Sequence, residues 1–383
     1  METRKLYYED CMLNTFTATV TGCQQTGKGW RITLDATAFY PEGGGQACDL
    51  GTLDDAAVLD VREENDTVYH LCDRPLEVGK TVTGNIHWER RFDLMQQHTG
   101  EHILSGLIHA KYGYHNVGFH MGKETVEVDF DGPIPAEELA LLEQQANEAV
   151  WENRSVHCWY PSPEELPTVK YRSKRALPWP VRVVDIPGYD KCACCGVHVA
   201  DTGQIGVIKI LSCVKFHQGI RLEMVCGKRA LDYLSRVYEQ NRLISQAFSA
   251  KILETGAAAQ RMNEQLAAEK FRAACLEKQV FRSIAASYGG NGNVVHFEDG
   301  LTSSSLRELA DAIADTCGGV AAVFSAQDDT HYSMCLICKG GDVKELGTAA
   351  AKALSGRGGG KPGSFQGSVN ATRQQIEAFF QTR

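Results

Sequence analysis

The sequence lacks a hydrophobic run long enough to cross a membrane. No apolar stretch approaches the roughly 20 residues that a membrane-spanning helix needs. The first residues, METRKLYYEDCMLN, also lack the apolar segment of a secretory signal. We therefore expect a cytoplasmic protein.

The composition excludes a disulfide scaffold and a largely disordered chain. Its 14 cysteines are spread over 383 residues, so reduced thiols are expected. Hydrophobic residues make up 43% and charged residues 23%, as in ordinary globular proteins, and the length predicts two or three domains. The net charge of −9 disfavours non-specific adhesion to nucleic acid but permits local basic patches.

Proline is absent between Pro187 and Pro362. Mostly apolar residues recur every three or four positions from Leu234 to Val280, which predicts a long helix or a helical hairpin. Gly256 is the expected break because glycine is a poor helix former.

The remaining patterns predict an α+β protein with four parts. Short β-type runs separated by turn residues indicate a small β-barrel with a glycine-rich motif over residues 1–88. Helical and strand patterns alternate in an α+β core over 89–228, where a helix containing the sequence QQHTGEHILS should end at Gly113 and another should start after Pro135. We expect a helical arm over 229–286 and a C-terminal α/β domain over 287–383.

Two pairs of side chains have the spacing of metal ligands. His98 and His102 lie four residues apart on one helix face, and Cys194 and His198 repeat this spacing beside a glycine. Imidazole and thiolate are the ligands that zinc prefers. The sequence therefore predicts one zinc site assembled by the fold.

The spacing alone does not decide whether this zinc site is structural or catalytic. Four protein ligands also suit a closed structural site, and Cys192 and Cys195 are competing thiols. A zinc protease would need glutamate directly after the first histidine, where this chain has Thr99. Glu101 lies further along the helix and could orient a ligand or a water.

Two glycine-rich motifs complete the pattern. FYPEGGGQ places Gly43, Gly44 and Gly45 before Gln46, which allows the backbone to approach a ligand closely. A second motif, GRGGGKPGSFQG, lies near the C-terminus.

Taken in order, FYPEGGGQ, QHTGEHIL, CCGVHVADTGQIG and GRGGGKPGSFQG resemble the AlaX-type alanyl-tRNA editing proteins of the long form, related to the editing and C-terminal domains of alanyl-tRNA synthetase. The resemblance covers essentially the whole chain. Val197, Phe365 and Gln366 depart from the usual motifs without removing a presumed ligand. The resemblance implies zinc-dependent hydrolysis of mischarged tRNA(Ala) in trans, because the aminoacylation domain has no counterpart here.

Site roles follow from this resemblance as expectations. His98, His102, Cys194 and His198 would bind one zinc ion, and Gly43, Gly44 and Gly45 would contact the substrate. Gln46 and Glu101 are expected in catalytic roles, and Thr37 is the expected sensor of the serine hydroxyl. A pocket built to bind a hydroxyl can reject alanine strongly, whereas an apolar pocket rejects serine weakly.

Basic residues are the expected contacts for tRNA. Residues 169–182 contain five basic and no acidic side chains, and residues 343–383 contain six Lys or Arg against two Glu. A solvated loop would have the same composition. The candidates are Lys170, Arg172, Lys174, Arg175, Arg357 and Lys361.

Two other functions compete with editing. DHH-type phosphoesterases share the C-terminal domain, but the Asp-His-His tripeptide of their metal site is absent from this sequence. A non-catalytic RNA-binding protein with a structural zinc is the main alternative. A homodimer through the helical arm or the C-terminal domain is a further expectation.

Overall fold

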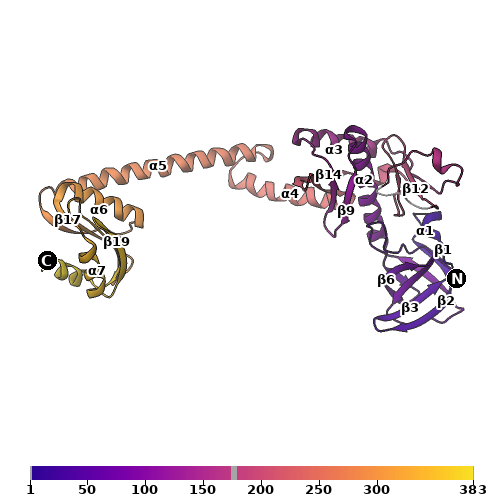
Figure 1. Ribbon diagram of the computed structural model, residues 1–383, viewed down its shortest axis with the longest axis horizontal. Helices are drawn as coiled ribbons and strands as arrows, with labels where there is room; N and C mark the ends of the chain where they lie inside the picture. The colour runs from indigo at the N-terminus through magenta and orange to yellow at the C-terminus, as the bar shows by residue number, and fades with distance from the viewer. Residues whose placement is uncertain (1, 174–178, 383) are drawn as a thin grey trace. The chain divides into compact units, whose positions relative to one another are not determined.

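The computed structural model describes residues 2–173 and 179–382, which divide into two compact units, Met1–Leu243 and Ile244–Arg383. Helices and strands mix in both units, which confirms the α+β class (Figure 1). The four-part division made from the sequence stays a prediction. Within the described ranges, no helix combines the length and apolarity required to span a bilayer.

The first unit begins with a closed six-stranded barrel. Its strands, in barrel order, are β2 (Thr15–Thr26), β3 (Gly29–Leu34), β7 (Thr67–Cys72), β6 (Ala56–Glu64), β5 (Gly51–Leu53) and β8 (Thr81–Ile86). Alternate residues point inward, as in β7, where Val68, His70 and Cys72 are buried. The short strands β1 (Arg4–Lys5) and β4 (Ala36–Thr37) pair in parallel, with helix α1 (Leu6–Glu9) following β1.

The rest of the first unit surrounds helix α2 (Trp88–Tyr112), which Gly113 ends in a left-handed conformation as expected. One sheet has the order β14 (Ile208–Phe216), β15 (Gly219–Cys226), β10 (Val126–Phe130) and β9 (Asn116–Met121). A second has the order β11 (His157–Trp159), β12 (Val183–Ile186) and β13 (Asp190–Ala193). Helix α3 (Ala136–Trp151) starts after Pro135, and the short 3-10 helices η1 (Leu166–Thr168) and η2 (Thr202–Ile205) complete the fold.

Helix α2 packs closely on its neighbours. A Cβ atom at Gly106 would come within 2.2 Å of the Tyr189 carbonyl oxygen, so only glycine allows α2 to lie this near the start of β13. Earlier in the helix, Arg91 is fully buried and forms an ion pair with the buried carboxylate of Asp49. The Arg91 guanidinium also donates to the Ala38 carbonyl, 2.6 Å away. These contacts join α2 to the barrel segment that precedes and follows the glycine-rich motif.

The predicted helical region is interrupted earlier than expected. Helix α4 (Gly227–Ala247) ends before Ser249, which has a φ of 48°, and the turn is closed by a 2.6 Å hydrogen bond from Ser245 Oγ to the Ala250 carbonyl. The 3-10 helix η3 (Ile252–Glu254) and helix α5 (Thr255–Ser287) follow. Gly256 lies inside α5, so its assignment as the break was wrong: the preceding turn decides where the helix stops.

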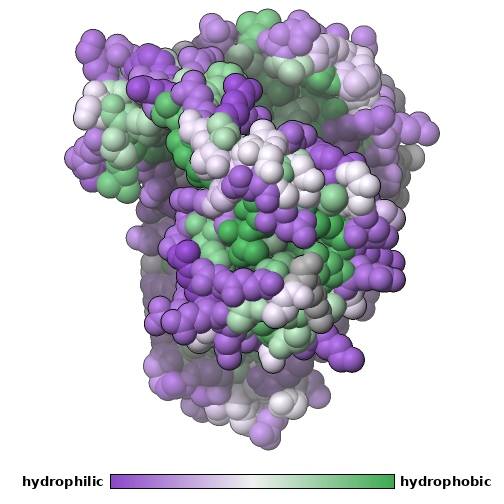
Figure 2. All heavy atoms as spheres, turned by 90° about the vertical axis from the view of Figure 1, so that its left-hand side faces the viewer, coloured by the Kyte–Doolittle hydropathy of each residue, from purple (hydrophilic) through white to green (hydrophobic). Residues whose placement is uncertain are grey.

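The second unit contains a five-stranded sheet in the order β16 (Gly292–Phe297), β17 (Gly318–Ala326), β18 (His331–Ile337), β20 (Ser364–Asn370) and β19 (Arg357–Lys361). Helices α6 (Ser303–Cys317), α7 (Lys344–Ala353) and α8 (Arg373–Gln381) complete it, and two apolar clusters use residues from the sheet. Figure 2 looks toward this unit and shows a largely hydrophilic face with hydrophobic side chains interspersed. The GRGGGKPGSFQG motif forms the β19–β20 hairpin.

Candidate active site

Four side chains predicted as metal ligands meet inside the first unit. His98 and His102 project from α2, while Cys194 and His198 lie in the segment after β13. One ligand atom from each lies within 4.8 Å of the others. Cys194 Sγ is 3.4 Å from His98 Nε2, and all three histidines are at least 97% buried. The fold thus joins two sequence motifs into one cluster.

The other ring nitrogen of each histidine is already occupied. His98 Nδ1 lies 2.9 Å from Gln46 Oε1, His102 Nδ1 lies 2.9 Å from Asp190 Oδ2, and His198 Nδ1 lies 3.2 Å from Thr99 Oγ1. Such contacts orient metal-binding imidazoles and direct Nε2 toward the ion. His198 Nε2 is buried with no hydrogen-bond partner among the residues that the structure describes. The donor set therefore fits a metal ion.

Burial and neighbouring groups favour the metal-binding forms of two ligands. Burial, reinforced by the nearby His98, lowers the pKa of His198 to about 3, so its imidazole is neutral. Burial raises the pKa of Cys194, but the neighbouring imidazoles of His98, His102 and His198 outweigh burial and hold this pKa well below its usual value. Neutral imidazole and thiolate are the forms that bind metals.

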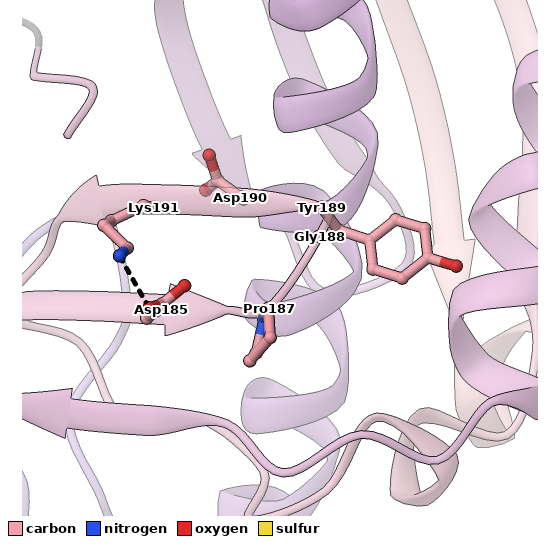
Figure 3. A pocket seen from close by; sticks show the side chains of 6 residues that line it. All are labelled: Asp185, Pro187, Gly188, Tyr189, Asp190 and Lys191. Carbon is pink, nitrogen blue, oxygen red and sulfur yellow. Dashed lines mark ion pairs between the residues drawn. The ribbon is translucent and has the colours of Figure 1, made fainter. Parts of the chain in front are cut away.

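The ion pair between Asp190 and Arg172 supports the Nδ1 side of the His102 ring. The Asp190 carboxylate that contacts His102 also accepts hydrogen bonds of 2.6 and 2.8 Å from Arg172. Figure 3 shows that the Asp190 side chain leaves β13 on the side away from the ion pair between Asp185 and Lys191. Alternation along the strand thus directs Asp190 toward the metal ligands.

The glycine-rich loop forms a wall beside the ligands. Gly44 and Gly45 have φ values of 58° and 84°, in the left-handed region that glycine adopts without strain. A Cβ atom at Gly45 would lie 2.6 Å from the Phe119 ring, and one at Gly44 would lie 3.0 Å from Cys195 Sγ. Gly43 and Gln46 exchange backbone hydrogen bonds across the turn. This turn places Gln46 against His98.

The ligands open into a cavity of about 890 Å³. Three of the four predicted ligands line this cavity: His98 and His102 from α2, and Cys194. The loop residues Gly44 and Gly45 line it as well. The other described lining residues are Glu101, His115, Asn116, Val117, Phe119, Asp131, Tyr160, Arg172, Ser173, Pro180, Val181, Arg182, Cys192, Ala193 and Cys195. The candidate metal site is therefore open to a ligand rather than sealed in the core.

Comparison with known proteins agrees with this arrangement. The family model for the "Threonyl and Alanyl tRNA synthetase second additional domain" matches residues 181–225, which include Cys194 and His198. The model for "tRNA synthetases class II (A)" matches residues 3–90, and the "DHHA1 domain" matches residues 282–382.

Relatives match over most of the chain. "Alanyl-tRNA editing protein Aarsd1" of Mus musculus is 29% identical over 97% of this chain and 96% of its own length. "Alanyl-tRNA editing protein Aarsd1-B" of Xenopus laevis is 28% identical over 93% of this chain and 88% of its own length. The chain is thus similar to alanyl-tRNA editing proteins over nearly its whole length. It also matches "Alanine--tRNA ligase" of Ignicoccus hospitalis, with 34% identity over 64% of this chain, but spans only 28% of that protein.

The structure brings some of the sequence-predicted site residues together and separates others. Gln46 and Glu101 lie beside the metal ligands, Gln46 through His98 and Glu101 in the cavity wall. Thr37 is fully buried in the barrel, where its hydroxyl contacts His70 Nε2 at 2.9 Å, and it is not among the described cavity residues. This placement does not support the predicted role of Thr37 as hydroxyl sensor.

The basic residues predicted to contact tRNA differ in their surroundings. Lys170 is exposed, but Arg172 is bound to Asp190, so its guanidinium supports the candidate metal site instead of forming a free basic surface. Lys174 and Arg175 lie outside the described residues. Arg357 and Lys361 are exposed on β19 of the second unit.

Sequence reasoning missed three side chains of this candidate site. Asp190 precedes Cys194 by four residues in the motif DKCACC, which was the available signal. Arg182 donates to the carbonyl oxygens of Cys194 and Gly196, at 3.0 and 2.7 Å, and so fixes the backbone around the thiolate. Asn116 lines the cavity, but no motif marks it.

Proposed function

We propose that this chain hydrolyses the ester of tRNA(Ala) mischarged with serine or glycine, acting in trans and with zinc in the site. The observation that carries the proposal is the cluster of His98, His102, Cys194 and His198 at an open cavity, in a chain similar to alanyl-tRNA editing proteins over nearly its whole length. These four residues would hold the ion. Zinc would supply Lewis-acid chemistry, by lowering the pKa of water and polarising a carbonyl group.

The chain's own residues would prepare the site for an ester. Gln46, Asp190 and Thr99 each fix one imidazole, so the ligands are held before substrate arrives. The glycine loop and Phe119 bound the space beside His98, whose ring stacks on Phe119 with centroids 5.4 Å apart. This wall would restrict the acyl group to a small side chain.

Deacylation assays test the proposal. Purified full-length protein should release serine or glycine from Ser-tRNA(Ala) or Gly-tRNA(Ala) while leaving Ala-tRNA(Ala) intact. His98→Ala should lose this activity and bound zinc but keep tRNA binding. If wild-type protein contained zinc and bound tRNA without cleaving any of the three esters, the non-catalytic alternative would replace the proposal.

The basic residues on β19 would hold the tRNA. Arg357 and Lys361 are exposed at the two ends of this strand. Replacing both with alanine should weaken tRNA(Ala) binding and reduce its salt dependence, because fewer phosphate contacts release fewer counterions. Lys170, Lys174 and Arg175 remain further proposed contacts. A homodimer through the helical arm or the C-terminal domain is likewise proposed, and sedimentation of the full chain tests it.

A further inference from the structure

Two polar side chains in the cavity wall form a buried pair that the metal centre does not use. Glu101 and Asn116 are 4% and 7% exposed, and both line the cavity. Asn116 Nδ2 donates to Glu101 Oε1 at 2.6 Å, and Ser105 Oγ donates to the same oxygen. Glu101 comes from α2 and Asn116 from the start of β9.

This hydrogen bond fixes the orientation of the Asn116 amide. A carboxylate accepts hydrogen bonds but donates none, so the amide nitrogen must face Glu101. The amide oxygen is then left over, and it is buried without a partner among the described residues. A buried carbonyl oxygen without a donor is rare in native proteins. Its position in the cavity wall indicates that a ligand supplies the donor.

The charges at this position define the ligand further. Asn116 Oδ1 is an acceptor, and the neighbouring carboxylate of Glu101 adds negative charge. Arg172 also lines the cavity, but its Nε and Nη2 donate to Asp190. A ligand that donates hydrogen bonds and carries positive charge matches this environment, and a primary ammonium group meets both conditions.

We infer that Glu101 and Asn116 bind the α-ammonium group of the aminoacyl ester. This inference rests on the proposed function, because only an aminoacyl ester presents that group here. Glu101 lies three residues after His98 and directly before His102 on α2, so it is within about one helical turn, roughly 5 Å, of both ligands. The ammonium nitrogen of an aminoacyl ester is two bonds from the ester carbonyl carbon, which matches this short separation.

The consequence is selectivity for esters with a free amine. An N-acylated ester has a neutral amide nitrogen at this position and adds an acyl group next to Glu101. The site would therefore hydrolyse a mischarged aminoacyl ester but spare a tRNA that carries a blocked or peptidyl group.

Single-turnover hydrolysis of Ser-tRNA(Ala) and N-acetyl-Ser-tRNA(Ala) by the zinc-loaded full chain tests the inference. Wild type should cleave the free-amine ester about 10- to 100-fold faster, the range expected for hydrogen bonds to a charged group. Asn116→Ala and Glu101→Gln should slow cleavage of the free-amine ester by about 10-fold or more and leave the acetylated ester almost unaffected. The ratio of the two rates is measured on the same preparation, so partial misfolding of a variant cancels.

Val117→Ala is the matched control, since Val117 is the next residue on β9, lines the same cavity and offers no side-chain acceptor. It should keep the wild-type ratio. Equal cleavage of both esters by wild type, or equal slowing of both by Asn116→Ala, would overturn the inference while the proposed function stood. If the site bound an inorganic cation instead of the ammonium group, Asn116→Ala would slow cleavage of both esters equally. Failure of wild type to cleave either ester would instead overturn the proposed function.

Discussion

Asp190 Oδ2 lies 2.9 Å from His102 Nδ1, and the same carboxylate is held by Arg172. This chain of contacts runs from a residue predicted to bind tRNA to a residue predicted to bind metal. Burial alone would lower the pKa of His102, yet the hydrogen bond with Asp190 contributes to raising it well above its usual value. Asp190 therefore interacts strongly with the ring that it orients.

Asp190→Ala should lower zinc affinity about 10- to 100-fold, because the His102 ring loses the partner that fixes its orientation. Competition with a chromophoric chelator measures this change. Asp185→Ala is the control, since Asp185 lies on the neighbouring strand and pairs with Lys191 instead. Equal zinc affinity in both variants would show that Asp190 does not support the ligand.

Gly45→Ala should reduce deacylation by about 10-fold or more, because a methyl group would meet the Phe119 ring and strain a backbone with φ of 84°. Gly79→Ala separates these two effects. Gly79 has nearly the same φ, 86°, but no atom within 4 Å of an added Cβ. That control should lose about 1 kcal/mol of stability and keep full activity. A similar activity loss in both variants would mean that backbone strain alone, and not the contact with Phe119, matters.

Arg91→Met should destabilise the first unit by about 3–5 kcal/mol, because it leaves the buried Asp49 carboxylate without its ion-pair partner. Arg74→Met removes an exposed ion pair with Asp73 and Asp55 and should cost far less stability, because solvent screens this pair. Urea unfolding followed by tryptophan fluorescence compares the two. Similar losses would mean that the Arg91 contacts do not hold the barrel segment on α2.

Acid should destabilise the barrel through His70. Burial lowers the pKa of His70 to about 4, although its hydrogen bond with the Ile32 carbonyl acts in the opposite direction. The unfolded chain, with a histidine pKa near 6.5, binds this proton first, so stability falls as the pH drops from about 6.5 to about 4. The loss should reach about 3 kcal/mol, from about 1.4 kcal/mol per pKa unit.

Urea unfolding at pH 7 and pH 4.5 measures this effect. His70→Gln should reduce the stability difference between the two pH values, while His157→Gln, at an exposed position of β11, should leave it unchanged. An unchanged pH dependence in His70→Gln would show that His70 is not the group that takes up the proton.

The sequence alone determined features that depend on neighbouring residues. Apolar spacing and Gly113 predicted helix α2 and its end, Pro135 predicted the start of α3, and the four-residue spacing predicted that His98 and His102 share one face of α2. These predictions succeed because helix periodicity, capping and the conformational limits of glycine and proline act within a few residues. The helix break was misplaced because Gly256 is tolerated inside α5, while Ser249 and the side chain of Ser245 form the turn.

Only the tertiary structure decided which distant side chains meet. The 4.8 Å cluster requires α2 to pack beside β13, and the contacts of Asp190 with His102 and of Asn116 with Glu101 cross between elements that no local pattern connects. Tertiary packing likewise placed the Thr37 hydroxyl against His70 of the barrel strand β7 instead of in the cavity. Such contacts depend on strand register and on close packing at residues such as Gly106, which are set by the whole folded chain rather than by any one segment.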